Sequence, residues 1–305
     1  MRTAFSDAVV RLATADPDVL LLTGDHGYAL FDEFRKSCAK QYINAGIAEQ
    51  NMVGMAAGLA RSGFRPIVYG LSAFVPVRVL EQIKLDVAHD NLPVIFIGDG
   101  AGFVYSHLGT SHQSTEDIAC TRAIPQLSVL SPADRFELAH CMESAYRSRA
   151  PVYLRMGKAD RGDVHQAALG IDAGGILEVR RGSVGAVALI ATGSMVRTAA
   201  ALADAHFPAA SVWSVPSIKP LDADRVEAIA THSSGIVVLE EHSILGGLGS
   251  AVTEVCAERR PIRVLRIGVQ DRFSEYCGSY EYLLREHGLD SATVQEKISA
   301  FIARP

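Results

Sequence analysis

Residues 42–74 read YINAGIAEQNMVGMAAGLARSGFRPIVYGLSAF and contain a short strand, a turn, a helix and a second strand in close succession. The first strand is predicted to end at Asn44, the turn contains Gly46, and Glu49 begins the helix. Open parallel sheets bind ligands beyond the carboxyl ends of their strands, so Glu49 is predicted to lie at a ligand site. Five small residues would let another backbone approach this helix closely, as at a subunit interface: Gly54, Ala56, Ala57, Gly58 and Ala60.

The rest of the chain repeats this alternation of short apolar runs and longer helical patterns. Within residues 1–156 we expect strands at 19–23, 41–44, 67–71, 93–98, 127–130 and 152–155, and helices at 48–62, 77–89 and 133–147. Residues 157–185 are rich in glycine and charged residues and are predicted to form a linker. The alternation resumes in residues 186–305, with strands within 187–193, 211–216, 235–241 and 262–268 and helices at 196–206, 223–231 and 248–258. This pattern predicts the α/β class, with two domains that each contain a mostly parallel sheet covered by helices.

Composition excludes several classes of protein. The 305 residues are 49% hydrophobic, which excludes a disordered chain and fits two domains of ordinary size. The 29 Lys and Arg against 34 Asp and Glu give a net charge of -5, and no basic stripe marks a nucleic-acid-binding surface. The five cysteines are far apart without a C-x-x-C pair, which argues against disulfides and zinc and favours a cytoplasmic location. The N-terminal residues lack a signal-peptide pattern, and no apolar run approaches the roughly 20 residues of a membrane span.

The polar and aromatic residues near the predicted sheet edge have ordinary structural explanations when considered alone. A glutamate in the first turn of a helix, as Glu49 is, interacts favourably with the helix dipole by about 0.3–1 kcal/mol. Phe74 follows an apolar strand, as many core residues do, and Asp25 in TGDHG is typical of a turn. In the run SHLGTSHQS, a hydrogen bond of His112 could simply order the loop. Neither His112 nor His107 has nearby cysteines or clustered carboxylates that would indicate a metal site.

Eight segments taken together carry a more specific signal. The first five are GIAEQNMVGMAAGLA at 46–60, YGLSAF at 69–74, LPVIFIGDGAGFVYSHLGTSHQSTEDIA at 92–119, IPQLSVLSPAD at 124–134 and APVYLR at 150–155. The last three are KPLD at 219–222, VVLEEHSILGGLGSAV at 237–252 and VLRIGVQDRF at 264–273. These segments resemble, in family order over nearly the whole chain, the pyrimidine-binding and C-terminal domains of the transketolase and 1-deoxyxylulose 5-phosphate synthase group of thiamine diphosphate enzymes.

The resemblance implies a cofactor role for three residues. Glu49 matches the family glutamate that hydrogen-bonds a pyrimidine ring nitrogen of thiamine diphosphate. Protonating that nitrogen drives the neighbouring amino group toward its imino form, which can deprotonate the thiazolium carbon, so the chemistry needs an acid there. Phe74 matches an aromatic residue beside the pyrimidine, although Val77 stands where relatives often carry a second aromatic residue. Asp25 resembles a polar residue that lines the cofactor cleft.

The resemblance also implies substrate contacts. His112, in GTSHQ, matches a histidine over the thiazolium that handles substrate protons, and an imidazole both donates and accepts protons near neutrality. Sugar transketolases usually carry an acidic residue four positions earlier, where this chain has Leu108. We therefore expect His107 to replace that carboxylate in part, and a substrate other than a standard pentose phosphate. Arg155 matches an arginine that helps to bind the substrate phosphate, and a surface arginine at the strand end is the alternative.

Two glycine-containing runs are expected to be structural. Gly98, Asp99 and Gly100 resemble the start of a diphosphate and magnesium motif, but no asparagine follows at the required 25 to 30 residues. The run GGLGS at 246–250 could bind a phosphate at a helix start, but a tight strand-to-helix turn is the preferred interpretation. We therefore expect no metal ligand in this chain.

The resemblance implies that this chain is the C-terminal subunit of a split transketolase. The chain begins with Met at the pyrimidine-binding portion, so the diphosphate-binding domain and its Mg²⁺ are expected in a separate N-terminal subunit, in an α2β2 complex. The expected activity is transfer of a two-carbon ketol unit from a ketose or ketose phosphate to an aldehyde acceptor. The alternatives are the β subunit of a 2-oxo acid dehydrogenase and a non-catalytic paralogue that assembles with or regulates a thiamine enzyme.

Overall fold

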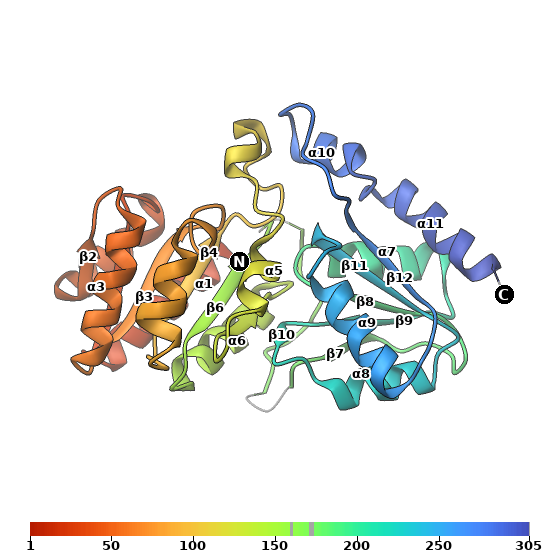
Figure 1. Ribbon diagram of the computed structural model, residues 1–305, viewed down its shortest axis with the longest axis horizontal. Coiled ribbons are helices and arrows are strands. Elements are labelled where there is room, and N and C mark those ends of the chain that lie inside the picture. Colours follow the sequence, from red (N-terminus) through yellow and green to blue (C-terminus); the bar gives the residue numbers. More distant parts are fainter. Residues whose placement is uncertain (159–160, 171–173, 305) are drawn as a thin grey trace.

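The computed structural model describes residues 1–158, 161–170 and 174–304, which form two helix-covered sheets (Figure 1). The first sheet has seven strands in the order β10-β5-β6-β4-β3-β1-β2, and its strands are parallel except β10. The strands are β1 Val19–Thr23, β2 Tyr42–Asn44, β3 Arg65–Leu71, β4 Ile95–Asp99, β5 Ser128–Leu130, β6 Val152–Met156 and β10 Ser217–Lys219. The predicted parallel α/β architecture is therefore confirmed for this half.

Alternate residues of the first sheet pack on opposite layers of helices. In β1, which is buried throughout, Leu20 and Leu22 share a core cluster with α3, whereas Val19 and Leu21 pack with α1, α2 and α6. This burial on both faces explains the continuous apolar runs of these strands. The helices of this half are α1 Arg2–Ala15, α2 Asp32–Ser37, α3 Glu49–Arg61, α4 Leu80–Gln82, α5 Asp117–Arg122 and α6 Arg135–Arg147.

The second sheet has five strands in the order β12-β11-β8-β9-β7, and β7 is antiparallel to its neighbour β9. Helices α8 and α9 contribute to the core on one face, and α7, α10 and α11 on the other. The strands are β7 Leu177–Arg180, β8 Ala188–Ala191, β9 Ser211–Ser214, β11 Ile236–Ser243 and β12 Val264–Val269. The helices are α7 Met195–His206, α8 Ala223–Thr231, α9 Leu248–Arg259, α10 Tyr280–Glu286 and α11 Ser291–Ala303.

The helix expected at 77–89 is instead three short pieces. A 3₁₀ turn, η3, covers Val77–Val79, α4 follows, and a π-helix, η4, covers Ile83–Ala88. The buried residues Val79, Ile83 and Val87 are four positions apart, which exceeds the 3.6-residue period of an α-helix. The wider π turn keeps these side chains on one buried face, and such turns occur mostly as short local insertions.

The expected linker at 157–185 also differs in part from the structure. Its last residues form β7, which pairs with β9, so the second sheet begins at Leu177. An earlier part is held on α6, because the Oδ2 atom of Asp134 accepts hydrogen bonds from the backbone N–H groups of Val164 and His165. Residues 159–160 and 171–173 lie outside the described part of the chain. The predicted linker therefore extends too far, because the short edge strand Leu177–Arg180 forms only by pairing with Ser211–Ser214, which lies much later in the chain.

The two halves of the molecule share a core and backbone hydrogen bonds. Strand β10 comes from the second half of the chain but pairs with β5 of the first sheet. One continuous apolar cluster includes residues from α3, β3, α8 and α9. The backbone N–H of Ser243 also donates to the carbonyl of Thr115 over 2.7 Å. Among the residues described, no helix has the length and apolar character that crossing a bilayer requires.

Candidate active site

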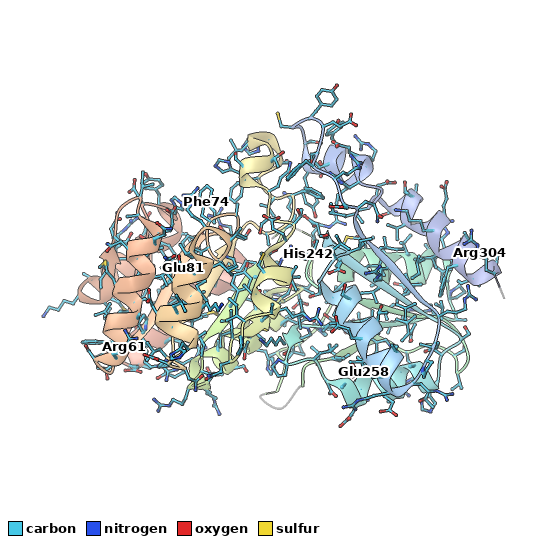
Figure 2. The ribbon with its side chains drawn as sticks, viewed as in Figure 1. Arg61, Phe74, Glu81, His242, Glu258 and Arg304 are labelled. Carbon is cyan, nitrogen blue, oxygen red and sulfur yellow. The ribbon has the colours of Figure 1, made fainter. Side chains whose placement is uncertain are left out.

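The candidate residues follow four neighbouring parallel strands. Asp25 follows β1, Glu49 follows β2, Phe74 follows β3, and the loop that carries His107 and His112 follows β4. Because parallel neighbours end at the same edge of a sheet, their loops meet there. Figure 2 labels Phe74 in the loops at this edge, close to the first sheet's helices.

Glu49 combines burial with an unused hydrogen-bond acceptor. It is the first residue of α3, and only 5% of its surface is exposed. Its Oε2 atom accepts a hydrogen bond from Nη1 of Arg78 over 3.1 Å, in an ion pair. Its Oε1 atom is buried and accepts no hydrogen bond from any residue that the structure describes. A buried acceptor left this way costs about 1–3 kcal/mol, so a donor from outside the described chain would stabilise the site.

Phe74 lies at the centre of a group of rings and charges. Its ring centroid is 5.3 Å from that of His112, in an edge-to-face arrangement with an interplanar angle of 66°. The Cζ atom of Arg78 lies 4.0 Å from the Phe74 centroid, so the guanidinium that pairs with Glu49 also covers this ring. Phe74 is only partly buried. The structure thus brings Glu49, Phe74 and His112 together and does not place Phe74 in the apolar core.

Asp25 lies beside this group at the end of β1. It is exposed, with a φ of 61°, and its Oδ1 atom accepts a hydrogen bond from Nδ2 of Asn44 over 3.4 Å. The next residue, His26, was not singled out in the sequence although it follows the same strand. Its ring lies 6.2 Å from that of Phe74, and its Nε2 atom is buried and bonded to none of the described residues. Arg78 was likewise missed, because nothing in its sequence context indicates the contact with Glu49.

The loop after β4 carries the two predicted histidines differently. His112 is partly buried, and its Nδ1 atom shares a hydrogen bond of 3.0 Å with Oγ of Ser111. The following residue, Gln113, accepts a hydrogen bond at Oε1 from Oγ of Ser274 over 2.9 Å. The second half of the chain therefore supports the His112 loop. His107, by contrast, is exposed and has no ring contact with Phe74 in the described structure.

Arg155 does not join this group, and the structure contradicts its interpretation as a surface arginine. Its side chain is buried, whereas a surface arginine was the alternative. Its Nε atom donates to Oδ2 of Asp117 over 2.8 Å, and its Nη2 atom donates to the carbonyl of Glu241 over 2.8 Å and to that of Ser114 over 3.3 Å. These contacts form an ion pair within the first half and one hydrogen bond to the second half, so the Nε and Nη2 atoms of Arg155 are already bound inside the protein. A single sequence shows the charge of Arg155 but not what packs around it.

The two glycine-containing runs are built into the fold, as expected. In the first, the carboxylate of Asp99 is buried and accepts a hydrogen bond from the hydroxyl of Tyr69 over 2.7 Å. In the second, the start of α9 holds a carboxylate of the same chain. Glu240 accepts hydrogen bonds from the N–H groups of Leu248 over 2.7 Å and Gly249 over 2.8 Å. The N–H groups of this helix start are therefore already bound to a carboxyl group of the same chain.

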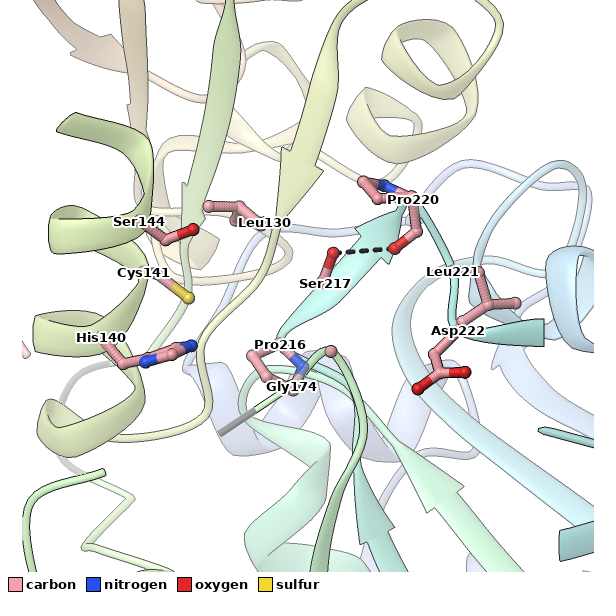
Figure 3. Close-up of a pocket in the computed structure, with 11 residues that line it drawn as sticks. Leu130, His140, Cys141, Ser144, Gly174, Pro216, Ser217, Pro220, Leu221 and Asp222 are labelled. Atoms are coloured by element: carbon pink, nitrogen blue, oxygen red, sulfur yellow. Dashed lines mark hydrogen bonds between the residues drawn. The ribbon is translucent and has the colours of Figure 1, made fainter. Parts of the chain in front are cut away.

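A cavity of about 490 Å³ opens elsewhere, beside the edge strand β10 (Figure 3). It lies between α6 and the segment that enters α8, whereas the candidate residues follow β1 to β4. The lining residues drawn in Figure 3 include Leu130, His140, Cys141, Ser144, Gly174, Pro216, Ser217, Pro220, Leu221 and Asp222. In the described residues, no three His, Cys, Asp or Glu side chains come together in a way that could hold a metal ion.

Comparisons with known proteins agree with the predicted family. Residues 1–162 match the transketolase pyrimidine-binding domain, and residues 177–294 match the transketolase C-terminal domain. The chain is 32% identical, over 99% of its length and 97% of the relative's, to one of the subunits of the apulose-4-phosphate transketolase of Phocaeicola vulgatus. It is 36% identical over 99% of its length to 1-deoxy-D-xylulose-5-phosphate synthase of Chlorobium luteolum, of which it spans only 48%.

A solved structure gives the same result at the level of the fold. The chain matches a split-gene transketolase, described as an inactive β4 tetramer, with a TM-score of 0.89 and 31% identity. The match covers 98% of this chain and 97% of the other. The chain therefore belongs to the transketolase family, and its two halves correspond to that family's pyrimidine-binding and C-terminal domains.

Proposed function

We propose that this chain provides the pyrimidine-binding half of a thiamine diphosphate site and takes part in the transfer of a two-carbon ketol unit. The observation that carries the proposal is the carboxylate of Glu49, which is 5% exposed and has one oxygen without a described hydrogen-bond donor. A protonated ring nitrogen is a donor of the kind that this oxygen lacks. The partly buried ring of Phe74, joined to Glu49 through Arg78, offers an aromatic surface for the ring plane. The residues present therefore fit the pyrimidine of the cofactor.

Each residue has a separate task in this proposal. When bound, thiamine diphosphate supplies the carbon nucleophile, and the protein supplies orientation and proton transfer. Glu49 holds a proton at the pyrimidine nitrogen, Phe74 packs on the ring, and Asp25 lines the cleft. His112 exchanges protons with the substrate, as an imidazole beside a reacting group can. His107 contacts the substrate from the loop surface, where the structure places it in solvent.

A second polypeptide is part of the proposal. The relative in Phocaeicola vulgatus is named as one subunit of a transketolase, and this chain covers nearly all of it. We propose a diphosphate-binding N-terminal subunit that holds Mg²⁺, in an α2β2 complex with two-fold symmetry. The five cysteines are free in the structure, which fits a reducing cytoplasm. The substrates are a ketose or ketose phosphate and an aldehyde acceptor, as sugar-transferring relatives indicate.

The test reconstitutes the chain with its diphosphate-binding partner, thiamine diphosphate and Mg²⁺. We expect ketol transfer from the mixture and none from this chain by itself. Glu49→Gln is expected to lower turnover by at least about 10²-fold, the contribution of a positioned proton-transfer group, while light scattering shows the same complex. Glu258→Gln, on an exposed residue of α9 (Figure 2), is the control and is expected to keep wild-type turnover.

Other outcomes of this experiment would contradict the proposal. Transfer by the chain without a partner would exclude the split site. Wild-type turnover in Glu49→Gln would remove the carboxylate from the mechanism. Release of carbon dioxide from pyruvate, in place of ketol transfer, would favour the 2-oxo acid dehydrogenase alternative, and turnover by the partner in the absence of this chain would favour the non-catalytic paralogue.

A further inference from the structure

Arg78 occupies the place where the two proposed contacts of the pyrimidine meet. Its Nη1 atom donates to Oε2 of Glu49 over 3.1 Å, and its Cζ atom lies 4.0 Å from the centroid of Phe74. A single planar group with N–H donors thus packs on the aromatic ring and pairs with the carboxylate at the same time. These are the two interactions that a protonated pyrimidine would make with Phe74 and Glu49.

The guanidinium and the pyrimidine cannot both occupy this position. Stacked planar groups approach to roughly 3.5–4 Å, which is the separation already taken up by the guanidinium on Phe74. A second planar group between Phe74 and Glu49 would overlap the guanidinium. Arg78 leaves the Oε1 atom of Glu49 without a hydrogen bond. Because Oε1 belongs to the same carboxylate, a pyrimidine that packs on Phe74 and reaches Oε1 would still displace the guanidinium.

We propose that Arg78 is an internal occupant of the pyrimidine site, which pairs with Glu49 and covers Phe74 in the chain without cofactor and moves into solvent when the cofactor binds. This inference rests on the proposed function. It assigns Arg78 a role in setting cofactor affinity, which is distinct from the proton transfer assigned to Glu49.

The difference in exposure between the two charged residues supports this exchange. The side chain of Glu49 is 5% exposed, whereas that of Arg78 is 47% exposed, so Arg78 reaches the carboxylate from the surface. A buried carboxylate without a counter-charge is costly, and Arg78 stabilises it while the site is empty. Displaced into water, the guanidinium regains its hydration. Glu81, which is exposed three residues later, then offers it a new ion pair of the i, i+3 kind.

This internal contact lowers cofactor affinity, because its energy is lost when the cofactor enters. A partly exposed ion pair and an exposed cation–π contact are both weak interactions, and together they correspond to a roughly 3- to 30-fold effect on affinity. Arg78→Gln is therefore expected to bind thiamine diphosphate about 3- to 30-fold more tightly than the wild type.

The experiment measures the dissociation constant of thiamine diphosphate with Mg²⁺ by calorimetry, on the complex with the diphosphate-binding subunit. Arg61→Gln is the matched control, because it removes the same charge and an exposed ion pair with Asp90 near the other end of α3. We expect its dissociation constant to equal that of the wild type. In the background of Glu49→Gln, which removes the charge that holds Arg78, the effect of Arg78→Gln on the dissociation constant is expected to shrink.

Arg78→Lys keeps a positive charge near Glu49 but loses the planar group, so it tests the inference if Arg78→Gln folds poorly. It too is expected to bind the cofactor more tightly than the wild type. Unchanged or weaker binding by the folded variants would overturn the inference, as would a cofactor-loaded structure that retains the 3.1 Å contact. In each case a loss of turnover in Glu49→Gln would still support the proposed function, so the two ideas fail separately.

Discussion

At the scale of single residues, the proposed chemistry depends on which polar side-chain atoms already have a hydrogen-bond partner within the chain. Both the Oε1 atom of Glu49 and the Nε2 atom of His26 are buried without a described hydrogen-bond partner. The Nδ1 atom of His112 shares a hydrogen bond with Ser111, so the proposed proton transfer uses Nε2. Phe74 links these residues, because its ring contacts the rings of both His26 and His112.

Replacement of His112 tests the assignment of substrate proton transfer. His112→Asn is expected to lower kcat by about 10²–10⁴-fold, the usual contribution of a positioned general acid or base. Affinity for thiamine diphosphate should not change, because the cofactor contacts are assigned to Glu49, Phe74 and Asp25. The comparison is His107→Asn in the same loop: as an exposed substrate contact, His107 is expected to affect KM, with a much smaller effect on kcat. Steady-state kinetics in which the two variants behave alike would contradict the assignment.

At the scale of elements, β11 carries consecutive buried ionisable residues that hold the starts of two helices. Glu240 accepts hydrogen bonds from the first turn of α9, and burial raises its pKa to about 7. The Nε2 atom of His242 accepts from the N–H groups of Ile118 over 3.2 Å and Ala119 over 3.3 Å, at the start of α5. Its Nδ1 atom donates to the carbonyl of Ser243 over 2.7 Å, so the imidazole is neutral. Burial lowers the pKa of His242 to about 4.

The lowered pKa of His242 predicts a specific loss of stability in acid. An unfolded histidine takes up a proton near its ordinary pKa of 6.5, whereas folded His242 does so only at about 4. Its contribution to stability is therefore complete above pH 6.5 and is lost as the pH falls toward 4, by up to about 3 kcal/mol. Glu240 acts in the opposite direction, since its raised pKa favours the folded state increasingly as the pH falls from about 7 toward its ordinary 4.5.

His242→Gln removes only the histidine contribution, because an amide oxygen can still accept at the start of α5. Urea unfolding between pH 7 and pH 4.5 should show that the wild type loses up to about 3 kcal/mol more than this variant. The comparison with the variant cancels the opposing contribution of Glu240. Parallel pH profiles for the two proteins would show that His242 does not titrate as the structure indicates.

At the scale of the whole molecule, a buried arginine of the first half forms an ion pair within that half and a hydrogen bond to the second half. Arg155 of β6 pairs with Asp117 of α5, and its Nη2 atom also reaches the carbonyl of Glu241 in β11. The hydroxyl of Tyr153 donates to the same carboxylate oxygen over 2.7 Å. Removing one partner of a buried pair leaves an uncompensated charge, which costs far more than the pair contributes.

Asp117→Asn is accordingly expected to lower the free energy of unfolding by about 3–5 kcal/mol, measured by urea titration. Asp204→Asn is the control, because Asp204 pairs with Arg180 while 71% of its own side chain is exposed. Such exposed pairs contribute about 0–1 kcal/mol. If the two variants lost similar amounts of unfolding free energy, burial would not increase the contribution of the Arg155–Asp117 pair to stability.

The sequence by itself determined the family, the α/β class and most of the elements. Strands at 19–23 and helices at 223–231 are found at those residues, because apolar periodicity is a local property of the chain. Glu49 was also placed correctly at the start of its helix, since the strand, the turn and the helix follow one another within a few residues. The alternation of strands and helices likewise predicted the carboxyl edge of the sheet as the place of the proposed site.

Only the tertiary structure decided what each side chain contacts. Strands β7 and β10 are short and depend on distant neighbours for their hydrogen bonds, so their own sequences do not reveal them. The π-helix at Ile83–Ala88 follows from which face is buried. The burial of Arg155 against Glu241, and the contact of Arg78 with Glu49, depend on groups brought together from distant parts of the chain. The sequence shows which residues are charged. The role of each charge depends on its exposure to solvent and on the groups that the folded chain places next to it.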